Sequence, residues 1–168
     1  MTVSINVNRG FERVSEFQWE IDNPKDNDFK IEDVKLPARA TRTSAGYDIF
    51  ATQPIWLFPQ DEIQMPLGFK VYMREGEVFQ IYPRSKQGFN FYLRLANSVG
   101  IIDSDYYDNS KNEGHCWIKL RNEGDEAFSA EVGEAIGQGI FQKFLLADGD
   151  TFLGGKLREG GLGSTDKK

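Results

Sequence analysis

The sequence predicts an all-β fold in a single domain, and three observations lead to this expectation. Short runs in which apolar and polar residues alternate recur along the chain, which is typical of strands with one buried face. Turn-forming residues separate these runs, and no long apolar stripe has the spacing of a helix. With 168 residues and 39% hydrophobic content, the chain is long enough for one domain with its own core. Many short strands joined by turns indicate a sandwich or a barrel.

The strand predictions rest on period-two alternation, because successive side chains of a strand point to opposite faces. The alternation is clearest in three segments, and three shorter runs have the same β-like composition. In chain order, the predicted strands cover residues 17–21, 56–58, 67–73, 78–82, 116–120 and 140–145.

Turn and helix signals fall between these strands. Residues 23–28 form a polar loop, and 74–76 and 122–124 are expected to be hairpin turns because each ends in glycine. We expect a short helix directly after Ser85, since a serine can cap the first turn of a helix.

The two ends of the chain differ from its middle. We expect one β-barrel domain over residues 1–152, with an atypical N-terminal segment over 1–35, and a flexible arm over 153–168. The arm is rich in glycine and has few apolar anchors, as a frayed C-terminus does. It also carries Arg158, Ser164 and Thr165, which are residue types that bind phosphate, so an arm that closes over a ligand is the second interpretation.

Composition excludes several functions. The net charge of −6 argues against a nucleic-acid-binding surface, which normally needs a basic face. With a single cysteine, Cys116, and a single histidine, His115, a disulfide within the chain and a Cys/His zinc site are both excluded. No segment has the length and apolar character of a membrane span or a signal peptide, so we expect a cytoplasmic protein without membrane contact.

Two segments carry residue types suited to phosphate chemistry. Arg84 offers a planar fork of donors that matches phosphate oxygens, with Ser85 and Lys86 directly after it. Asp103 and Asp105 are two residues apart, so on a strand both would point to the same face. A carboxylate is ionised at neutral pH and can accept a proton from water. A surface loop and a hydrophilic hairpin end are the blander interpretations of these two segments.

Five short segments together resemble, in order and separation, the five motifs of the trimeric dUTPase family. They are AGYDIFA (45–51), YPRSKQG (82–88), NSVGIIDSDYYD (97–108), GEAIGQGIF (133–141) and REGGLGST (158–165). The resemblance implies a jelly-roll-like β-barrel that hydrolyses dUTP to dUMP and pyrophosphate with Mg²⁺. It also implies a homotrimer whose subunits share each active site.

The resemblance also implies a role for individual residues. Asp103 would be the general base that directs water at the α-phosphorus, and Asp48 would order water around the metal. Tyr106 would pack beneath the deoxyribose, and Leu162 would cover the base where many members have Phe. The residues implied for phosphate are Arg84, Ser85, Lys86, Gln138, Arg158, Ser164 and Thr165, and those implied for uracil are Asn97, Gly100, Ile101 and Ile102.

Two other functions stay open at this point. One is a related nucleotide enzyme of the dCTP deaminase type, because a base pocket built from backbone groups is hard to read from sequence. The other is a non-catalytic β-barrel with a regulatory or interaction role, for which the N-terminal segment would be the best candidate surface.

Overall fold

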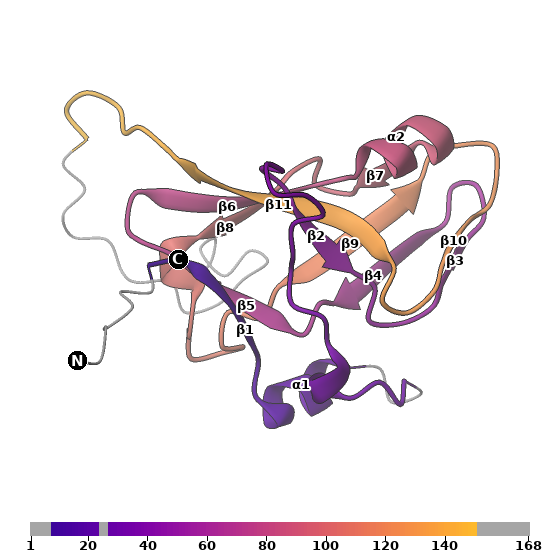
Figure 1. The fold of residues 1–168 in the computed structure, drawn as a ribbon, viewed down its shortest axis with the longest axis horizontal. Coiled ribbons are helices and arrows are strands. Elements are labelled where there is room, and N and C mark those ends of the chain that lie inside the picture. The colour runs from indigo at the N-terminus through magenta and orange to yellow at the C-terminus, as the bar shows by residue number, and fades with distance from the viewer. Residues whose placement is uncertain (1–7, 24–26, 151–168) are drawn as a thin grey trace, which may run out of the picture.

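The computed structural model describes residues 8–23 and 27–150, and these residues form a mainly antiparallel β structure with a few short helices (Figure 1). The all-β class predicted from the sequence is confirmed. The first half of the chain contains β1 (Gly10–Arg13), α1 (Glu16–Asp22), η1 (Ile31–Asp33), β2 (Tyr47–Phe50), β3 (Ile55–Leu57), β4 (Glu62–Pro66), β5 (Phe69–Tyr72) and β6 (Glu77–Tyr82). The second half contains α2 (Ser85–Phe91), β7 (Leu93–Leu95), β8 (Gly100–Asp103), η2 (Ser104–Tyr106), β9 (Trp117–Asn122), β10 (Phe128–Ala130) and β11 (Ala135–Lys143).

The described strands divide among four small sheets. The largest has the order β2-β11-β6-β8, a second has the order β4-β9-β7, and β1-β5 and β10-β3 form two pairs. Within the described ranges these sheets do not close into a barrel. The glycine-ended turns predicted at 74–76 and 122–124 are present, but each joins strands of different sheets, so neither is a hairpin.

The main core lies between the sheets and contains 18 buried apolar residues. Alternation in the sequence explains it, since Ile118 and Leu120 of β9 are buried while their neighbours Trp117 and Lys119 are only partly covered. Phe11 of β1 packs edge-on against Phe69 and Phe79, with ring centroids 5.8 and 5.3 Å apart. The N-terminal segment is thus joined to the core through the β1–β5 pair.

Residues 17–21 were predicted as a strand, and this prediction is wrong because they lie within α1. Alternation over five residues does not distinguish a strand from a helix. The residue at the start of this segment favours the helix. The hydroxyl of Ser15 accepts a hydrogen bond from the Gln18 backbone N–H at 3.1 Å and caps the helix. Trp19 then packs inward with Val14, Ile31 and Val34 in a small second core.

The two helices occupy opposite sides of the molecule. In Figure 1, α1 lies beyond the β1–β5 pair, whereas α2 lies beside β7 on the other side of the strands. Each is seven residues long, and no described helix is long and apolar enough to cross a membrane. The expected division into a domain over 1–152 and an arm over 153–168 stays a prediction, because 151–168 lie outside the described residues.

Candidate active site

Three neighbouring strands bring three of the predicted site residues to one place. Gln138 of β11 lies opposite Asp48 of β2 on one side and opposite Tyr82 of β6 on the other. Arg84 follows Tyr82 by two residues, so the sheet places Arg84 beside Asp48. Its guanidinium Nε lies 3.1 Å from Asp48 Oδ1 in a salt bridge, and its Nη1 donates to the Ala135 carbonyl at 3.4 Å.

Side-chain amides fix the main chain around Arg84. Gln138 Nε2 donates to the Pro83 carbonyl at 3.1 Å, and Gln87 Nε2 donates to the Ala135 carbonyl at 2.8 Å. Pro83 has no backbone N–H and cannot extend the sheet pairing, so β6 ends at Tyr82. The helix α2 begins shortly after it, at Ser85. The two amides therefore hold the β6–α2 junction against β11.

The helix predicted after Ser85 is present, but its start differs from the prediction. Arg84 is the N-cap residue and makes no side-chain capping hydrogen bond, and Ser85 is the first helical residue. A cap must have extended backbone, and the ψ of 150° at Arg84, which follows proline, provides it. The side chains of Ser85 and Lys86 consequently extend from an exposed first turn.

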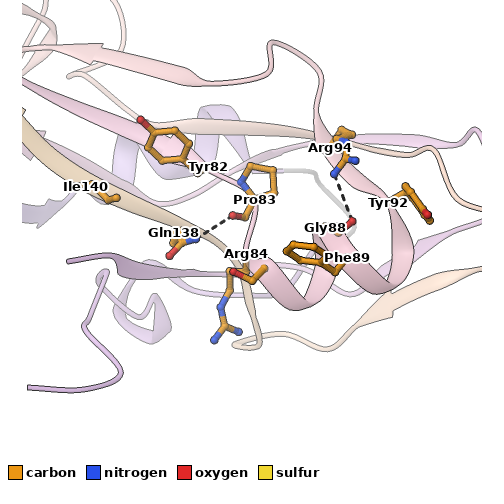
Figure 2. Close-up of a pocket in the computed structure, with 10 residues that line it drawn as sticks. Tyr82, Pro83, Arg84, Gly88, Phe89, Tyr92, Arg94, Gln138 and Ile140 are labelled. Carbon is orange, nitrogen blue, oxygen red and sulfur yellow. Dashed lines mark hydrogen bonds between the residues drawn. The ribbon is translucent and has the colours of Figure 1, made fainter. Parts of the chain in front are cut away.

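Arg84 and Ser85 line a cavity of about 720 Å³ together with Gln138. Figure 2 shows the guanidinium of Arg84 extending away from the rings of Tyr82 and Tyr92. Three of the other lining residues, Phe89, Tyr92 and Arg94, lie outside all five sequence motifs. Phe89 is 82% exposed and Tyr92 is 56% exposed, and their position directly after the YPRSKQG segment was the signal that could have indicated them.

The predicted uracil residues form a separate region of the chain. Asn97 and Gly100 line a smaller cavity of about 250 Å³ between β7, β8 and β9, which also contains Trp117 and Lys119. Asn97 is exposed in the turn before β8. Ile101 and Ile102 lie on β8, where Ile101 is 49% exposed and Ile102 packs against the core.

The expectation that Asp103 and Asp105 share one face of a strand is wrong. β8 ends at Asp103, and Ser104–Tyr106 form the short helix η2. The pairing of β8 with β6 ends with Asp103 opposite Val78, so the chain beyond it turns away from the sheet. Asp103 is partly buried, whereas Asp105 is exposed.

Tyr106 is buried and 7% exposed, and both of its polar groups are engaged. Its hydroxyl donates to the His115 carbonyl at 3.0 Å and accepts from Asn112 Nδ2 at 2.8 Å. Its own carbonyl accepts from Asn109 Nδ2 at 2.8 Å. The sequence indicated Tyr106 but gave no sign of the asparagines that hold it.

Asp103 and Arg84 lie toward opposite ends of β6, whereas Gly100 pairs with Ile81 next to Tyr82. Tyr82 pairs with Gln138 at one end, and Val78 pairs with Asp103 four residues away. At about 3.3 Å per residue, the two ends are roughly 13 Å apart along the strand. Within one chain, Asp103 is therefore not beside Arg84.

The remaining predicted residues cannot be placed. Arg158, Leu162, Ser164 and Thr165 lie outside the described residues. Among residues 8–23 and 27–150, no group of three or more His, Cys, Asp or Glu side chains is arranged to hold a metal ion. A metal at this site would therefore depend on ligands besides the carboxylates of one described chain.

An all-β chain that sets an arginine–carboxylate cluster beside a large cavity is of a class suited to binding anionic ligands. The dUTPase family model matches residues 32–164. A deoxyuridine 5'-triphosphate nucleotidohydrolase of Lactococcus lactis subsp. lactis (strain IL1403) is 42% identical over 157 residues, covering 94% of this chain and 97% of that protein. This chain belongs to the dUTPase family, and it is an enzyme.

Solved structures agree with this assignment. The crystal structure of dUTPase from Streptococcus mutans has a TM-score of 0.66 at 37% identity, covering 83% of this chain and 99% of that one. A dUTPase from phage phi11 of S. aureus, described with a structural Mg(II) ion, shares the fold with a TM-score of 0.61 at 17% identity, covering 84% and 94%. The names of these relatives favour dUTP hydrolysis over the deaminase and non-catalytic alternatives.

Proposed function

We propose that this enzyme hydrolyses dUTP to dUMP and pyrophosphate by attack of water on the α-phosphorus. Asp103 accepts a proton from the water as its oxygen bonds to the α-phosphorus. The bond between that phosphorus and the α–β bridging oxygen breaks, and pyrophosphate leaves with the electron pair. The observation that carries the proposal is the cluster of Arg84, Asp48 and Gln138 beside a cavity of about 720 Å³, in a chain of the dUTPase family.

Arg84 and Ser85 are proposed to bind the triphosphate. The salt bridge with Asp48 orients the guanidinium, whose remaining N–H groups face charge that develops on the phosphates. The exposed ammonium of Lys86 adds positive charge at the start of α2, and Gln138 keeps the Pro83 carbonyl in place. Arg158, Ser164 and Thr165 are proposed to complete the phosphate site from the arm over 153–168.

Asn97, Gly100, Ile101 and Ile102 are proposed to recognise uracil, with Leu162 of the arm covering the base. The side-chain amide of Asn97 and the backbone groups of the turn offer both donors and acceptors, as a base-pairing partner does. A cytosine would present a donor where uracil has an acceptor and an acceptor where uracil has a donor. This mismatch would leave buried polar groups unpaired, which costs binding free energy. Tyr106 packs beneath the sugar and leaves no room for a 2′-hydroxyl.

Mg²⁺ fits this site as an ion held mainly by phosphate oxygens and water. Magnesium keeps several waters and commonly takes only one or two carboxylates from the protein. Asp48 supplies a carboxylate whose Oδ1 is engaged by Arg84, so its other oxygen could order a metal-bound water. When bound, the ion would neutralise phosphate charge and orient the substrate.

The separation of Asp103 from Arg84 along β6 supports a shared active site. Asp103 and Arg84 of one chain lie at opposite ends of that strand, so they can act on one phosphorus only if they come from different subunits. We propose a homotrimer in which the uracil region of one subunit faces the Arg84 region of the next, and the arm comes from the third.

The direct test of the activity is pyrophosphate release from dUTP, UTP, dCTP and dTTP, with Mg²⁺ and with excess chelator. We expect rapid release from dUTP with Mg²⁺, at least 10²-fold slower release from the other nucleotides, and little release after chelation. Ammonia release from dCTP would instead support deaminase chemistry. Equal release from all four nucleotides would contradict the proposed uracil site.

A further inference from the structure

Tyr106 is held by a loop that none of the five motifs includes, residues 109–115. Two hydrogen bonds converge on its hydroxyl, one from Asn112 Nδ2 at 2.8 Å and one to the His115 carbonyl at 3.0 Å. A third bond, from Asn109 Nδ2 to the Tyr106 carbonyl at 2.8 Å, fixes its main chain. Tyr106 is therefore held both at the hydroxyl of its side chain and at its main chain.

The two asparagines also hold each other and their own loop. Asn109 Nδ2 donates to Asn112 Oδ1 at 2.8 Å, and Asn109 Oδ1 accepts from the backbone N–H groups of Lys111 and Asn112. Asn112 Oδ1 further accepts from the Gly114 N–H at 3.2 Å. These bonds pair the polar groups of the turn with one another. The loop therefore holds the Asn112 Nδ2 donor at a fixed position.

The N-terminal segment supports this loop from its other side. The ring of His115 is fully buried, and its Nε2 accepts from the Gly68 N–H at 2.8 Å. This contact requires the proton on Nδ1, which lies 2.6 Å from Asp22 Oδ2 of α1. The backbone N–H and the hydroxyl of Ser15 donate hydrogen bonds to the carboxylate of Glu113 in the same loop, at 3.0 and 2.5 Å.

We infer that Asn112 is a positioning residue for sugar selectivity and that α1 stabilises the loop that carries it. The inference rests on the proposed role of Tyr106 beneath the deoxyribose. Since Tyr106 is 7% exposed, a ligand can touch only a small part of it, and the position of that part decides whether a 2′-hydroxyl fits. A ring released from Asn112 can retreat and admit ribose.

The test compares kcat/KM for dUTP and for UTP in the full-length enzyme with Mg²⁺. Asn112→Ala is expected to lower the dUTP/UTP ratio about five-fold, the effect of losing the bond to the Tyr106 hydroxyl, mainly through a lower KM for UTP. Tyr106→Phe also removes the bond to the His115 carbonyl and is expected to lower the ratio at least as much. Ser110→Ala, an exposed position in the same loop, is the control and should leave the ratio unchanged.

A double-mutant cycle separates positioning from general loosening. If Asn112 acts through the Tyr106 hydroxyl, Asn112→Ala should cause no further loss of selectivity in the Tyr106→Phe background. Two independent losses that multiply would overturn the inference, and so would an unchanged ratio in Asn112→Ala. Should that variant fail to fold, Asn112→Leu has a similar branched shape but offers the Tyr106 hydroxyl neither a donor nor an acceptor, and it is expected to shift the ratio similarly.

One further variant distinguishes failure of this inference from failure of the proposed function. Tyr106→Ala should abolish most of the sugar selectivity, whatever holds the ring. If Tyr106→Ala keeps the wild-type ratio, the proposed sugar role of Tyr106 is wrong. If Tyr106→Ala loses selectivity but Asn112→Ala and Asn112→Leu do not, only the positioning role is wrong.

Discussion

The Arg84 region and the Tyr106 region are built in opposite ways. Arg84 lies at a strand end beside an open cavity, and a single salt bridge and one long hydrogen bond direct its side chain. Tyr106 is buried, and a loop of neutral amides engages its hydroxyl and its carbonyl. The role proposed for the Arg84 region is to bind charged phosphates, and exposed cations are sufficient for this. The role proposed for the Tyr106 region is to exclude one hydroxyl group, and this requires a side chain with a fixed position.

Asp103→Asn tests the chemical step and carries the largest expected effect. The amide keeps the size of the side chain but accepts no proton from water, so kcat should fall by roughly 10²–10⁴-fold. Binding of a non-hydrolysable dUTP analogue, measured by calorimetry, should change little. Turnover close to that of the wild type would remove Asp103 from the proposed mechanism.

Arg84→Ala tests the open, charged region. Loss of the guanidinium removes charge-assisted bonds to phosphate and leaves Asp48 without its partner, so kcat/KM for dUTP should fall roughly 10–150-fold. Arg121→Ala is the control, because it removes the same charge at an exposed position away from this cavity. An equal loss in both variants would point to net charge instead of the Arg84 site.

Asp22→Asn tests the support of the buried region, and its effect should depend on pH. Burial raises the pKa of Asp22, but hydrogen bonds from His115 and Gln18 outweigh burial and hold that pKa below its ordinary value. A depressed carboxylate pKa stabilises the fold above the pKa of the unfolded chain, and this stability is lost as the pH falls through the folded value. At pH 7, the variant should lose about 1–3 kcal/mol of unfolding free energy.

Urea unfolding followed by tryptophan fluorescence measures this difference, since the ring of Trp19 lies 6.0 Å from that of His115. The gap between wild type and Asp22→Asn should begin to shrink below about pH 4, where the carboxylate of the unfolded chain becomes protonated, and should shrink further as the pH falls through the lower pKa of folded Asp22. A gap that is constant from pH 7 to pH 3 would show that the charge of Asp22 contributes nothing.

Gly46→Ala should have the smallest effect. A Cβ at this position would lie 2.6 Å from Gln138 Oε1, so the amide must shift and weaken its bond to the Pro83 carbonyl. Because the end of a glutamine side chain moves easily, we expect kcat/KM to fall only about two- to ten-fold. The same substitution in a Gln138→Ala background should cost nothing more, and a further loss there would contradict this explanation.

The sequence predicted well what depends on local pattern. Alternation located the strands around Val71 and Ile118, a short β-like run located the strand around Ile81, and the chain after Ser85 is helical as expected. The pattern failed where the end of an element determines the structure. The Ser15 cap makes an alternating segment helical in α1, and β8 ends at Asp103, so Asp105 is not on that strand.

The support of Tyr106 could not be predicted, because its parts are distant in sequence. Nothing in the sequence connects His115 with α1, yet its ring joins α1 to the turn before β5 through Asp22 and Gly68. The asparagines at 109 and 112 have the composition of any polar loop. The role proposed for Asn112 depends on a buried hydroxyl whose position only the fold determines.

The division of the active site between subunits is the central claim, and mixing two impaired variants tests it. Asp103→Asn and Arg84→Ala are unfolded together in equal amounts and refolded, and dUTP hydrolysis is compared with that of each variant refolded alone. If every site takes Asp103 and Arg84 from different subunits, each mixed trimer regains one intact site, and about one quarter of wild-type activity returns. Activity no higher than that of the separate variants, in mixtures shown by mass spectrometry to contain mixed trimers, would contradict the shared site.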